Sequence, residues 1–176
     1  KVHNLTAIRD PLEMVTLHLL DSLSVLPHVQ ALAPKTLLDV GAGAGLPSIP
    51  LAICLPELQV SAIDSVAKKT SFMRQVKGEL GLSNFQVEVG RVEALKKPTK
   101  FDVIISRAFS EVGLFVKLTK HLLMENGQWL AMKGVVPAHE FEHQDFKSAD
   151  VQVNKIEVLE VAGLDAERHL VFLSAN

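Results

Sequence analysis

Apolar runs of strand length alternate with amphipathic segments along most of the chain. The runs that we interpret as strands are residues 36–40, 59–63, 85–89, 100–105 and 128–132. Between them, apolar side chains recur at three- or four-residue steps, most clearly in residues 66–80 and 110–124. That period is typical of helices with one buried face, and the alternation of strands and helices predicts an α/β fold with a mostly parallel sheet.

One further amphipathic helix is expected before the first strand. Asp10, Pro11 and Glu13 are a typical helix start, with an N-cap residue, a proline in the first turn and an acid that reaches back. The apolar face that follows comprises Leu12, Val15, Leu19, Leu23 and Leu26. We expect this face to lie on the sheet.

The C-terminal part of the chain has a different pattern. Residues 137–150 are polar and predict a short surface helix and a loop. Residues 151–161 and 168–173 then alternate as strands do, and the loop between them is too short for a helix, so they must pair antiparallel. The prediction is a mostly parallel sheet that ends in an antiparallel hairpin, with one antiparallel edge strand.

Composition narrows the class of protein. At 176 residues with 48% hydrophobic side chains, the chain fits one globular domain. No apolar run approaches the roughly 18 residues of a membrane span. The single cysteine, Cys54, is expected in the core and fits a reducing, cytoplasmic location. Because residue 1 is a lysine, we expect that an N-terminal segment is missing.

Charge and aromatic content limit how a nucleic acid could be bound. The formal net charge is -2, so an RNA partner would need a local basic face. Eight Phe, one Trp and no Tyr leave few platforms for base stacking, which argues against a broad single-strand binding surface.

A glycine-rich turn follows the first strand, in the sequence LLDVGAGAGLPSIP. Gly41, Gly43 and Gly45 permit a sharp strand-to-helix turn and a close approach of a ligand to the backbone. Their spacing is GxGxG, whereas the dinucleotide fingerprint is GxGxxG, and Leu46 stands where its third glycine would fall. The turn therefore predicts a nucleoside-type ligand.

Two prolines bear on which ligand this is. Pro47 and Pro50 stand in the expected first turn of the next helix and remove N–H donors that a phosphate would use. The turn thus favours an adenosine compound without phosphates, of which S-adenosylmethionine is the commonest, over NAD. A glycine turn that binds no ligand is the other alternative.

The ends of the second and third strands add candidate cofactor contacts. Asp64 follows the second strand and lies 19 residues after Gly45, where a carboxylate can accept from both ribose hydroxyls. Val92 and Glu93 follow the third strand. A backbone N–H there or the Glu93 carboxylate could meet an adenine amino group, and the alternative is an ordinary loop acid.

Cations and an aromatic ring follow the fourth and fifth strands. Arg107 and Phe109 come after the fourth strand and Lys133 ends the fifth, which is where substrates of open α/β sheets bind. If the substrate is a nucleic acid, Arg107 could donate to a guanine O6 or bind a phosphate, and it could otherwise contact a cofactor carboxylate. Trp129, within the fifth strand, is expected in the core.

Further cations lie outside these strand ends. The helix over residues 66–80 carries Lys68, Lys69, Arg74 and Lys77, which fits an RNA contact face or an ordinary solvated surface. If the partner is RNA, Lys68, Lys69, Lys133 and Arg168 are the residues expected to hold its phosphates.

Two histidine patterns complete the candidate chemistry. His18 lies one turn from Asp21 and Ser22, which fits a proton-transfer pair or the polar edge of a helix. His139 and His143 are four residues apart, but no further His or Cys cluster completes a metal site, so no metal is expected.

Several sequence words together resemble one family, the bacterial small-subunit ribosomal RNA guanine-N7 methyltransferases, also called glucose-inhibited division protein B. The words are HNLTAIRDP, HLLDSL, LLDVGAGAGLPSIPLA, IDSVAKKTSFMRQV, GRVEAL, FDVIISRAF, AMKG and ERHLVFL. Two features depart from the family pattern: we expect that the family's additional N-terminal helical segment is missing, and the family's usual GTGPGLPGIP reads GAGAGLPSIP here.

The resemblance implies a class I S-adenosylmethionine-dependent methyltransferase fold. It places Gly41, Leu46, Val92, Glu93 and Arg107 on cofactor-binding positions. It also implies the substrate, N7 of one guanosine in the decoding-region loop of 16S rRNA, met in the 30S subunit or an assembly intermediate. The alternatives are a small-molecule or protein methyltransferase, an NAD-dependent oxidoreductase and a non-catalytic cofactor-sensing module.

Overall fold

The computed structural model describes residues 15–107, 109 and 111–176, so the predicted helix start at Asp10 to Glu13 lies outside the described residues. One seven-stranded sheet runs through the structure in the order β3-β2-β1-β4-β5-β7-β6. Its strands are β1 (Thr36–Val40), β2 (Gln59–Asp64), β3 (Phe85–Val89), β4 (Phe101–Ser106), β5 (Leu123–Lys133), β6 (Val151–Val158) and β7 (His169–Ala175). β1 to β5 are mutually parallel, as the sequence pattern predicts.

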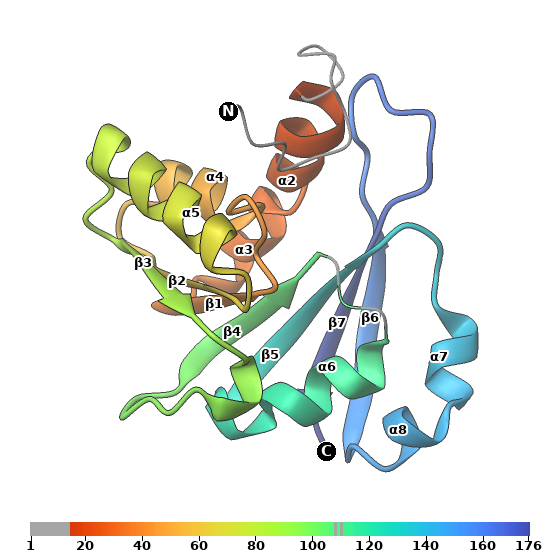
Figure 1. The fold of residues 1–176 in the computed structure, drawn as a ribbon. Helices are drawn as coiled ribbons and strands as arrows, with labels where there is room; N and C mark the ends of the chain where they lie inside the picture. The colour runs from red at the N-terminus through yellow and green to blue at the C-terminus, as the bar shows by residue number, and fades with distance from the viewer. Residues whose placement is uncertain (1–14, 108, 110) are drawn as a thin grey trace.

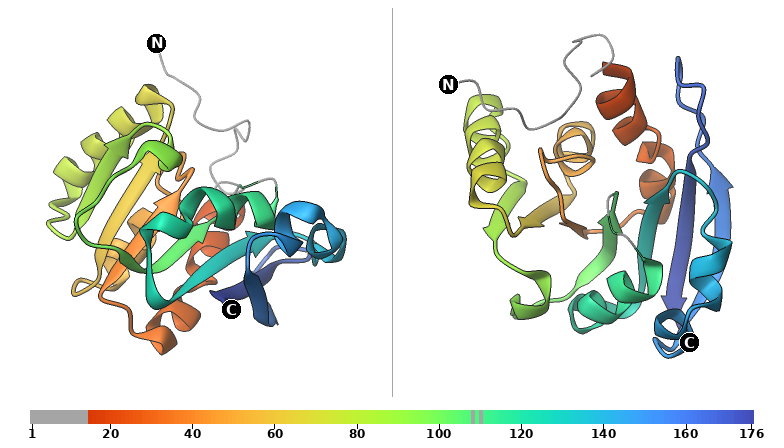
Figure 2. Two further views of the ribbon diagram at one scale, coloured as in Figure 1. Left: turned by 90° about the horizontal axis from the view of Figure 1, so that it is seen from below. Right: turned by 45° about the vertical axis from the view of Figure 1, so that its right-hand side comes forward.

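Helices cover both faces of this sheet (Figures 1 and 2). One face carries α3 (Leu26–Leu32), α4 (Ser48–Cys54) and α5 (Ala67–Leu80), preceded by a π-helical turn at Val15–Leu20 and by α2 (Asp21–Leu23). The other carries α6 (Val112–Thr119), α7 (Ala138–Glu142) and α8 (Gln144–Lys147). Short 3₁₀ turns lie at Val92–Ala94 and Lys120–Leu122.

The core consists of two apolar layers, one on each side of the sheet. Leu37 packs into the layer with α4 and α5, whereas its neighbour Leu38 packs into the layer with α6. In β4, Ile105 packs into the same layer as Leu37, and Ile104 packs into the same layer as Leu38. Successive side chains point to opposite faces of a strand, so a sheet covered on both faces needs continuous apolar runs. Trp129 is fully buried, as predicted.

The antiparallel strand is not at the edge of the sheet, so that prediction is wrong. β7 pairs antiparallel with both β5 and β6, and β6 is the edge strand. Burial explains the order: the first five residues of β7 are buried, whereas most residues of β6 are exposed. The more apolar strand takes the interior place, and the one with polar side chains faces solvent.

Two other predictions differ from the structure. β5 begins at Leu123 rather than Gln128, because a register irregularity between Phe101 and Val103 and a left-handed Asn126 (φ 65°) let the strand continue. Cys54 is exposed and not a core residue, because it is the last residue of α4 and lies beyond the buried residues 48–52. Among the described residues, no helix is long and apolar enough to cross a membrane.

Candidate functional site

The glycine turn lies at the carboxyl end of β1, next to β2. Gly41 and Gly43 have positive φ angles of 70° and 61°, and the Gly41 N–H donates to the Ile63 carbonyl at 2.9 Å. A Cβ on Gly41 would meet no atom within 4 Å, and one on Gly43 would meet only the Gly41 carbonyl oxygen, at 4.0 Å. The backbone of this turn is therefore open to a ligand.

Gly45 has a different role from the other two glycines. A Cβ there would lie 2.3 Å from Ile49 Cδ1 and 3.3 Å from Met73 Cγ. Its missing side chain lets α4 and α5 pack closely against the turn. Leu46 donates its N–H to the Ala42 carbonyl at 3.1 Å and closes the turn before α4 begins.

Asp64 ties the end of β2 to the glycine turn. Its Oδ2 accepts from the Gly43 N–H and its Oδ1 from the Val66 N–H, both at 2.9 Å. The residue is only 6% exposed, and Lys69 Nζ lies 3.8 Å from Oδ2. Each carboxylate oxygen keeps a second lone pair, so a ribose hydroxyl can still be accepted.

The end of β3 joins the same rim. The Gly90 N–H donates to the Asp64 carbonyl at 3.0 Å, which brings the 3₁₀ turn at Val92–Ala94 beside β2. Val92 is buried, and Glu93 is half-exposed with its carboxylate 3.5 Å from Arg91. The turn glycines, Asp64 and this pair are thus together at one end of the sheet.

A buried acid lies beneath the turn. Asp39, in β1, is fully buried; its Oδ2 accepts from the Ser48 N–H at 3.2 Å, while Asp39 Oδ1 and Ser48 Oγ have no hydrogen-bond partner among the described residues. Burial raises the pKa of Asp39 to about 6, against the opposing effects of Ser48 and the Arg107 charge. A cationic group bound at the turn would favour the ionised form.

Open turn glycines and unpartnered polar atoms beneath them fit a cofactor that brings positive charge. S-adenosylmethionine has this character. An adenosine cofactor with a chain of phosphates has the opposite charge and would find few N–H donors at α4, whose first turn contains Pro50.

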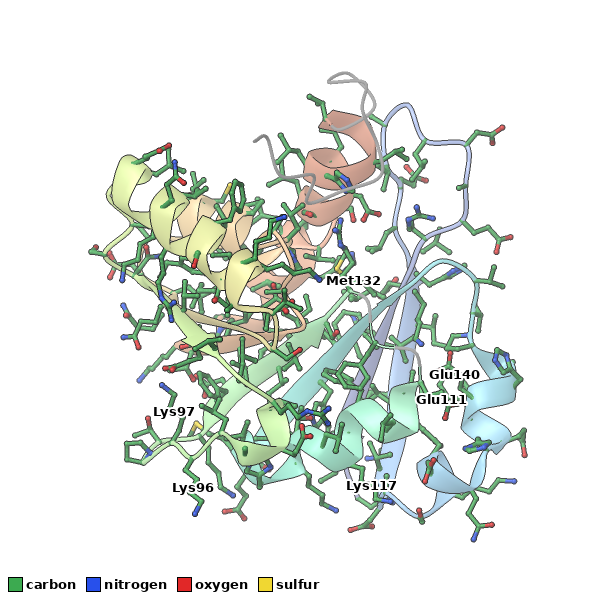
Figure 3. The ribbon with its side chains drawn as sticks, in the orientation of Figure 1. Lys96, Lys97, Glu111, Lys117, Met132 and Glu140 are labelled. Carbon is green, nitrogen blue, oxygen red and sulfur yellow. The ribbon has the colours of Figure 1, made fainter. Side chains whose placement is uncertain are left out.

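A second site lies beside the first, over the ends of β4 and β5. It is a cavity of about 470 Å³. Its lining residues are Leu17, His18, Asp21, Arg107, Met132, Lys133, Gly134, Leu159, Arg168 and His169. Met132, labelled in Figure 3, marks its place beneath the N-terminal helices.

Asp21 connects the two arginines of this cavity. Arg168 Nε donates to Asp21 Oδ1 at 2.9 Å, and Arg107 lies 3.5 Å from Oδ2. Burial and the Arg107 charge lower the pKa of His18, and Asp21 opposes them. Asp21 and His18 therefore share a site, but the Asp21 carboxylate is engaged by arginines. The sequence pattern did not indicate this ion-pair network.

Lys133 and Phe109 are held by protein contacts. Lys133 Nζ donates to both carboxylate oxygens of Glu140, at 2.8 and 2.9 Å, and its side chain is 12% exposed. Glu140 also accepts from the Val112 N–H at 2.7 Å, at the start of α6. The Phe109 ring packs on Phe115, with centroids 5.5 Å apart. These contacts give both residues structural roles beside the cavity, and they do not favour the predicted contacts with RNA.

The remaining cations differ in exposure. Lys68 on α5 is exposed, Lys69 is half-buried beside Asp64, and Arg168 is half-buried in the cavity. Arg74 donates to the Val87 carbonyl at 3.3 Å. Lys77 is half-buried near the end of α5. These cations do not form a single basic face, because Arg168 directly precedes β7, several strands away from β2 and β3, which α5 contacts.

One group of described side chains has the spacing of metal ligands. Glu111, His143 and Asp145 offer atoms within 4.8 Å of one another, whereas His139, the other histidine of the predicted pair, is not among them. Lys117 pairs with Asp145 at 3.8 Å. The group lies beside α6 and α8, on the opposite face of the sheet from α4 and α5 (Figure 3).

The fold and this arrangement define a class, the class I S-adenosylmethionine-dependent methyltransferases. An S-adenosylmethionine-dependent methyltransferase from Clostridium acetobutylicum superposes with a TM-score of 0.69 at 11% identity, over 90% of this chain and 92% of that one. The glycopeptide N-methyltransferase MtfA complexed with sinefungin gives a TM-score of 0.72 at 11% identity, over 89% and 87% of the two chains. At these identities the likeness shows the fold.

Sequence comparison identifies the family. The model of GidB, described as rRNA small subunit methyltransferase G, matches residues 1–171. The ribosomal RNA small subunit methyltransferase G of Methylobacillus flagellatus is 62% identical over 176 residues, which are all of this chain and 82% of that protein. The chain belongs to the rRNA small subunit methyltransferase G family. It is an S-adenosylmethionine-dependent rRNA methyltransferase.

Proposed function

We propose that this protein methylates N7 of one guanosine in the decoding-region (530) loop of 16S rRNA. One observation carries the proposal: the open glycine turn and the arginine-lined cavity share a rim. Ser106, at the end of β4, donates to the Val40 carbonyl at the end of β1 at 2.8 Å. Strand order reverses between β1 and β4, which is where open α/β sheets bind ligands.

The site has two halves, one for the cofactor and one for the substrate. The cofactor half lies at the carboxyl ends of β1, β2 and β3. S-adenosylmethionine supplies an electrophilic methyl group when it is bound. Gly41, Gly43 and Leu46 would line its path along the turn, with Gly45 keeping the turn in place. Asp64 would accept from the ribose hydroxyls, and Val92 with Glu93 would meet the adenine. The hydrogen bonds from Gly43 and Val66 fix the Asp64 carboxylate in advance.

Methylation of guanine N7 requires little acid–base catalysis by the protein. Guanine N7 has an in-plane lone pair and no proton to lose, so its attack on a methyl group needs no general base. Alignment of the reactants can contribute on the order of 7 to 11 kcal/mol. Asp21, the carboxylate among the residues that line the cavity, is held between arginines and is therefore not placed to act as a general base.

Arg107 lies between the two halves. Its charge acts on Asp39 beneath the turn and on His18 in the cavity. From this place its guanidinium would donate to guanine O6 or to a phosphate, or contact the cofactor carboxylate. Arg168 enters the same cavity and would hold an RNA phosphate.

Ribosomal RNA would extend beyond the cavity over the surrounding surface. Lys68 is placed for a phosphate contact, and Lys69 is placed to serve either Asp64 or a phosphate. The RNA would be met as part of the 30S subunit or an assembly intermediate, in the cytoplasm, without a metal ion. Contacts of this kind weaken as salt rises, because phosphate binding releases counterions.

Arg107→Ala tests this assignment, with Lys147→Ala as the matched control. Lys147 pairs with Glu142 on the opposite face of the sheet. Methyl transfer from labelled S-adenosylmethionine would be followed with 30S subunits, naked 16S rRNA and small metabolites. Arg107→Ala should reduce transfer to the RNA substrates, and Lys147→Ala should not. Wild-type levels of transfer and of cofactor affinity in Arg107→Ala would contradict the assigned role.

A further inference from the structure

Asp21 joins three segments that are distant in the sequence. It lies on α2, 86 residues from Arg107 and 147 residues from Arg168. Figures 1 and 2 show α2 beside the connection between β6 and β7, which ends at Arg168. One carboxylate therefore holds the N-terminal helices, the end of β4 and the start of β7 around one cavity.

Burial separates Asp21 from the groups that a ligand would touch. Asp21 is 4% exposed, whereas the side chains of Arg107 and Arg168 are 25% and 28% exposed. Asp21 lines the cavity, but each of its carboxylate oxygens is already engaged by an arginine. A guanosine or a phosphate in the cavity would therefore meet the more exposed guanidinium groups, and Asp21 would act on the reaction through them.

We infer that Asp21 is a positioning residue for methyl transfer: it fixes the guanidinium groups of Arg107 and Arg168 toward one bound nucleotide. This inference rests on the proposed function. The ligand is a nucleotide within an RNA strand, since two guanidinium groups in one cavity suit a base carbonyl and a phosphate.

Two physical effects support this role. A guanidinium is a planar fork on a flexible stem, and a fixed carboxylate selects one orientation from many. In addition, two like charges that face one cavity repel each other, and the Asp21 charge between them offsets that repulsion. Without Asp21, both arginines would keep their charge. Arg107 would lose the carboxylate that orients it, and Arg168 would keep its hydrogen bond to the Glu167 carbonyl, at 2.8 Å.

Asp21→Asn removes the charge and keeps the side-chain shape. Its kcat for methylation of 30S subunits should fall on the order of 10- to 100-fold, the scale of a misaligned reactant. Its affinity for S-adenosylhomocysteine should change much less than kcat, because Asp64 and the turn glycines, which would hold the adenosine, are untouched. The control is Asp150→Asn, which removes an exposed partner of Lys120 at the opposite end of the sheet and should leave kcat unchanged.

A double-mutant cycle with Arg168→Gln shows whether Asp21 acts through the arginines. Asp21→Asn should cost much less in the Arg168→Gln background, with a coupling on the order of tenfold, as residues in contact show. Asp21→Glu keeps the charge and should recover most of the kcat lost in Asp21→Asn. Should the asparagine variant be too unstable to purify, the cycle can be run with Asp21→Ser, which also lacks the charge, and non-additivity is again expected.

Four results would overturn the inference. The first is an Asp21→Asn variant with unchanged kcat and KM and only a lower melting temperature, and the second is additive effects in the double-mutant cycle. The third is a folded Asp21→Glu variant that is no more active than Asp21→Asn. The fourth is a large loss of S-adenosylhomocysteine affinity in Asp21→Asn. Failure of the proposed function would look different, because the wild-type protein would then transfer no label to ribosomal RNA.

Discussion

Replacing Asp39 by asparagine should stabilise the protein, and more at pH 8 than at pH 5. Asp39 lies fully buried beneath the glycine turn, where burial raises its pKa from 3.8 to about 6. Asparagine has nearly the same shape and still offers an oxygen to the Ser48 N–H. The substitution therefore removes the cost of a buried charge and keeps the hydrogen bond.

The size of the effect follows from the pKa shift. A group whose pKa is raised on folding contributes stability below its unfolded pKa and loses it as pH rises through its folded pKa. The rise of the Asp39 pKa from 3.8 to about 6, at about 1.4 kcal/mol per pKa unit, costs about 3 kcal/mol when Asp39 is ionised. The full cost applies at pH 8, and about half of it at pH 5.

Urea denaturation of the wild-type and Asp39→Asn proteins at both pH values measures this difference. The variant should gain up to about 3 kcal/mol of unfolding free energy at pH 8 and about half as much at pH 5. Asp150→Asn is the control with the opposite sign, because hydrogen bonds from Asn176 and Lys120 lower the pKa of Asp150. An Asp39→Asn effect that is equal at both pH values, or destabilising at pH 8, would refute the reasoning.

Three further substitutions separate packing from ligand binding. Gly45→Ala places a Cβ 2.3 Å from Ile49 Cδ1 and should lower the free energy of unfolding by about 1–3 kcal/mol, measured by urea denaturation. The Cβ that Gly41→Ala adds has no atom within 4 Å, so this variant should lose only about 1 kcal/mol of unfolding free energy, from left-handed backbone strain. It should nevertheless bind S-adenosylhomocysteine more weakly, measured by calorimetry. Equal binding by Gly41→Ala and wild type would contradict an open ligand path along the turn. Glu140→Gln leaves Lys133 without its carboxylate and should cost about 3 kcal/mol in the same denaturation assay, and a neutral result would mean that the pair adds nothing.

Local patterns in the sequence located most of the fold. β1 and β3 have the predicted bounds, and the helix predicted over residues 66–80 is α5, ended by Gly81 in a left-handed conformation. These features depend on neighbouring residues: apolar runs, a helical period and a glycine stop. The glycine turn and Asp64 also came from local signals, and the structure brings them together at one rim.

Features that depend on distant partners had no such signal. The insertion of β7 between β5 and β6 depends on which strand is more completely buried. Asp21 stood on the polar edge of a predicted helix, and its two arginine partners come from other parts of the chain. Neither spacing nor residue type indicates such a pairing, because the folded chain alone brings these groups within reach.

The most direct test of the central claim is to identify the methylated atom. The protein would be incubated with labelled S-adenosylmethionine and 30S subunits that lack the modification, and the RNA would then be cleaved chemically at N7-methylguanosine. The account predicts label in 16S rRNA and cleavage at one guanosine of the decoding-region loop. No label in ribosomal RNA at any salt concentration, or label without cleavage at a guanosine, would contradict it.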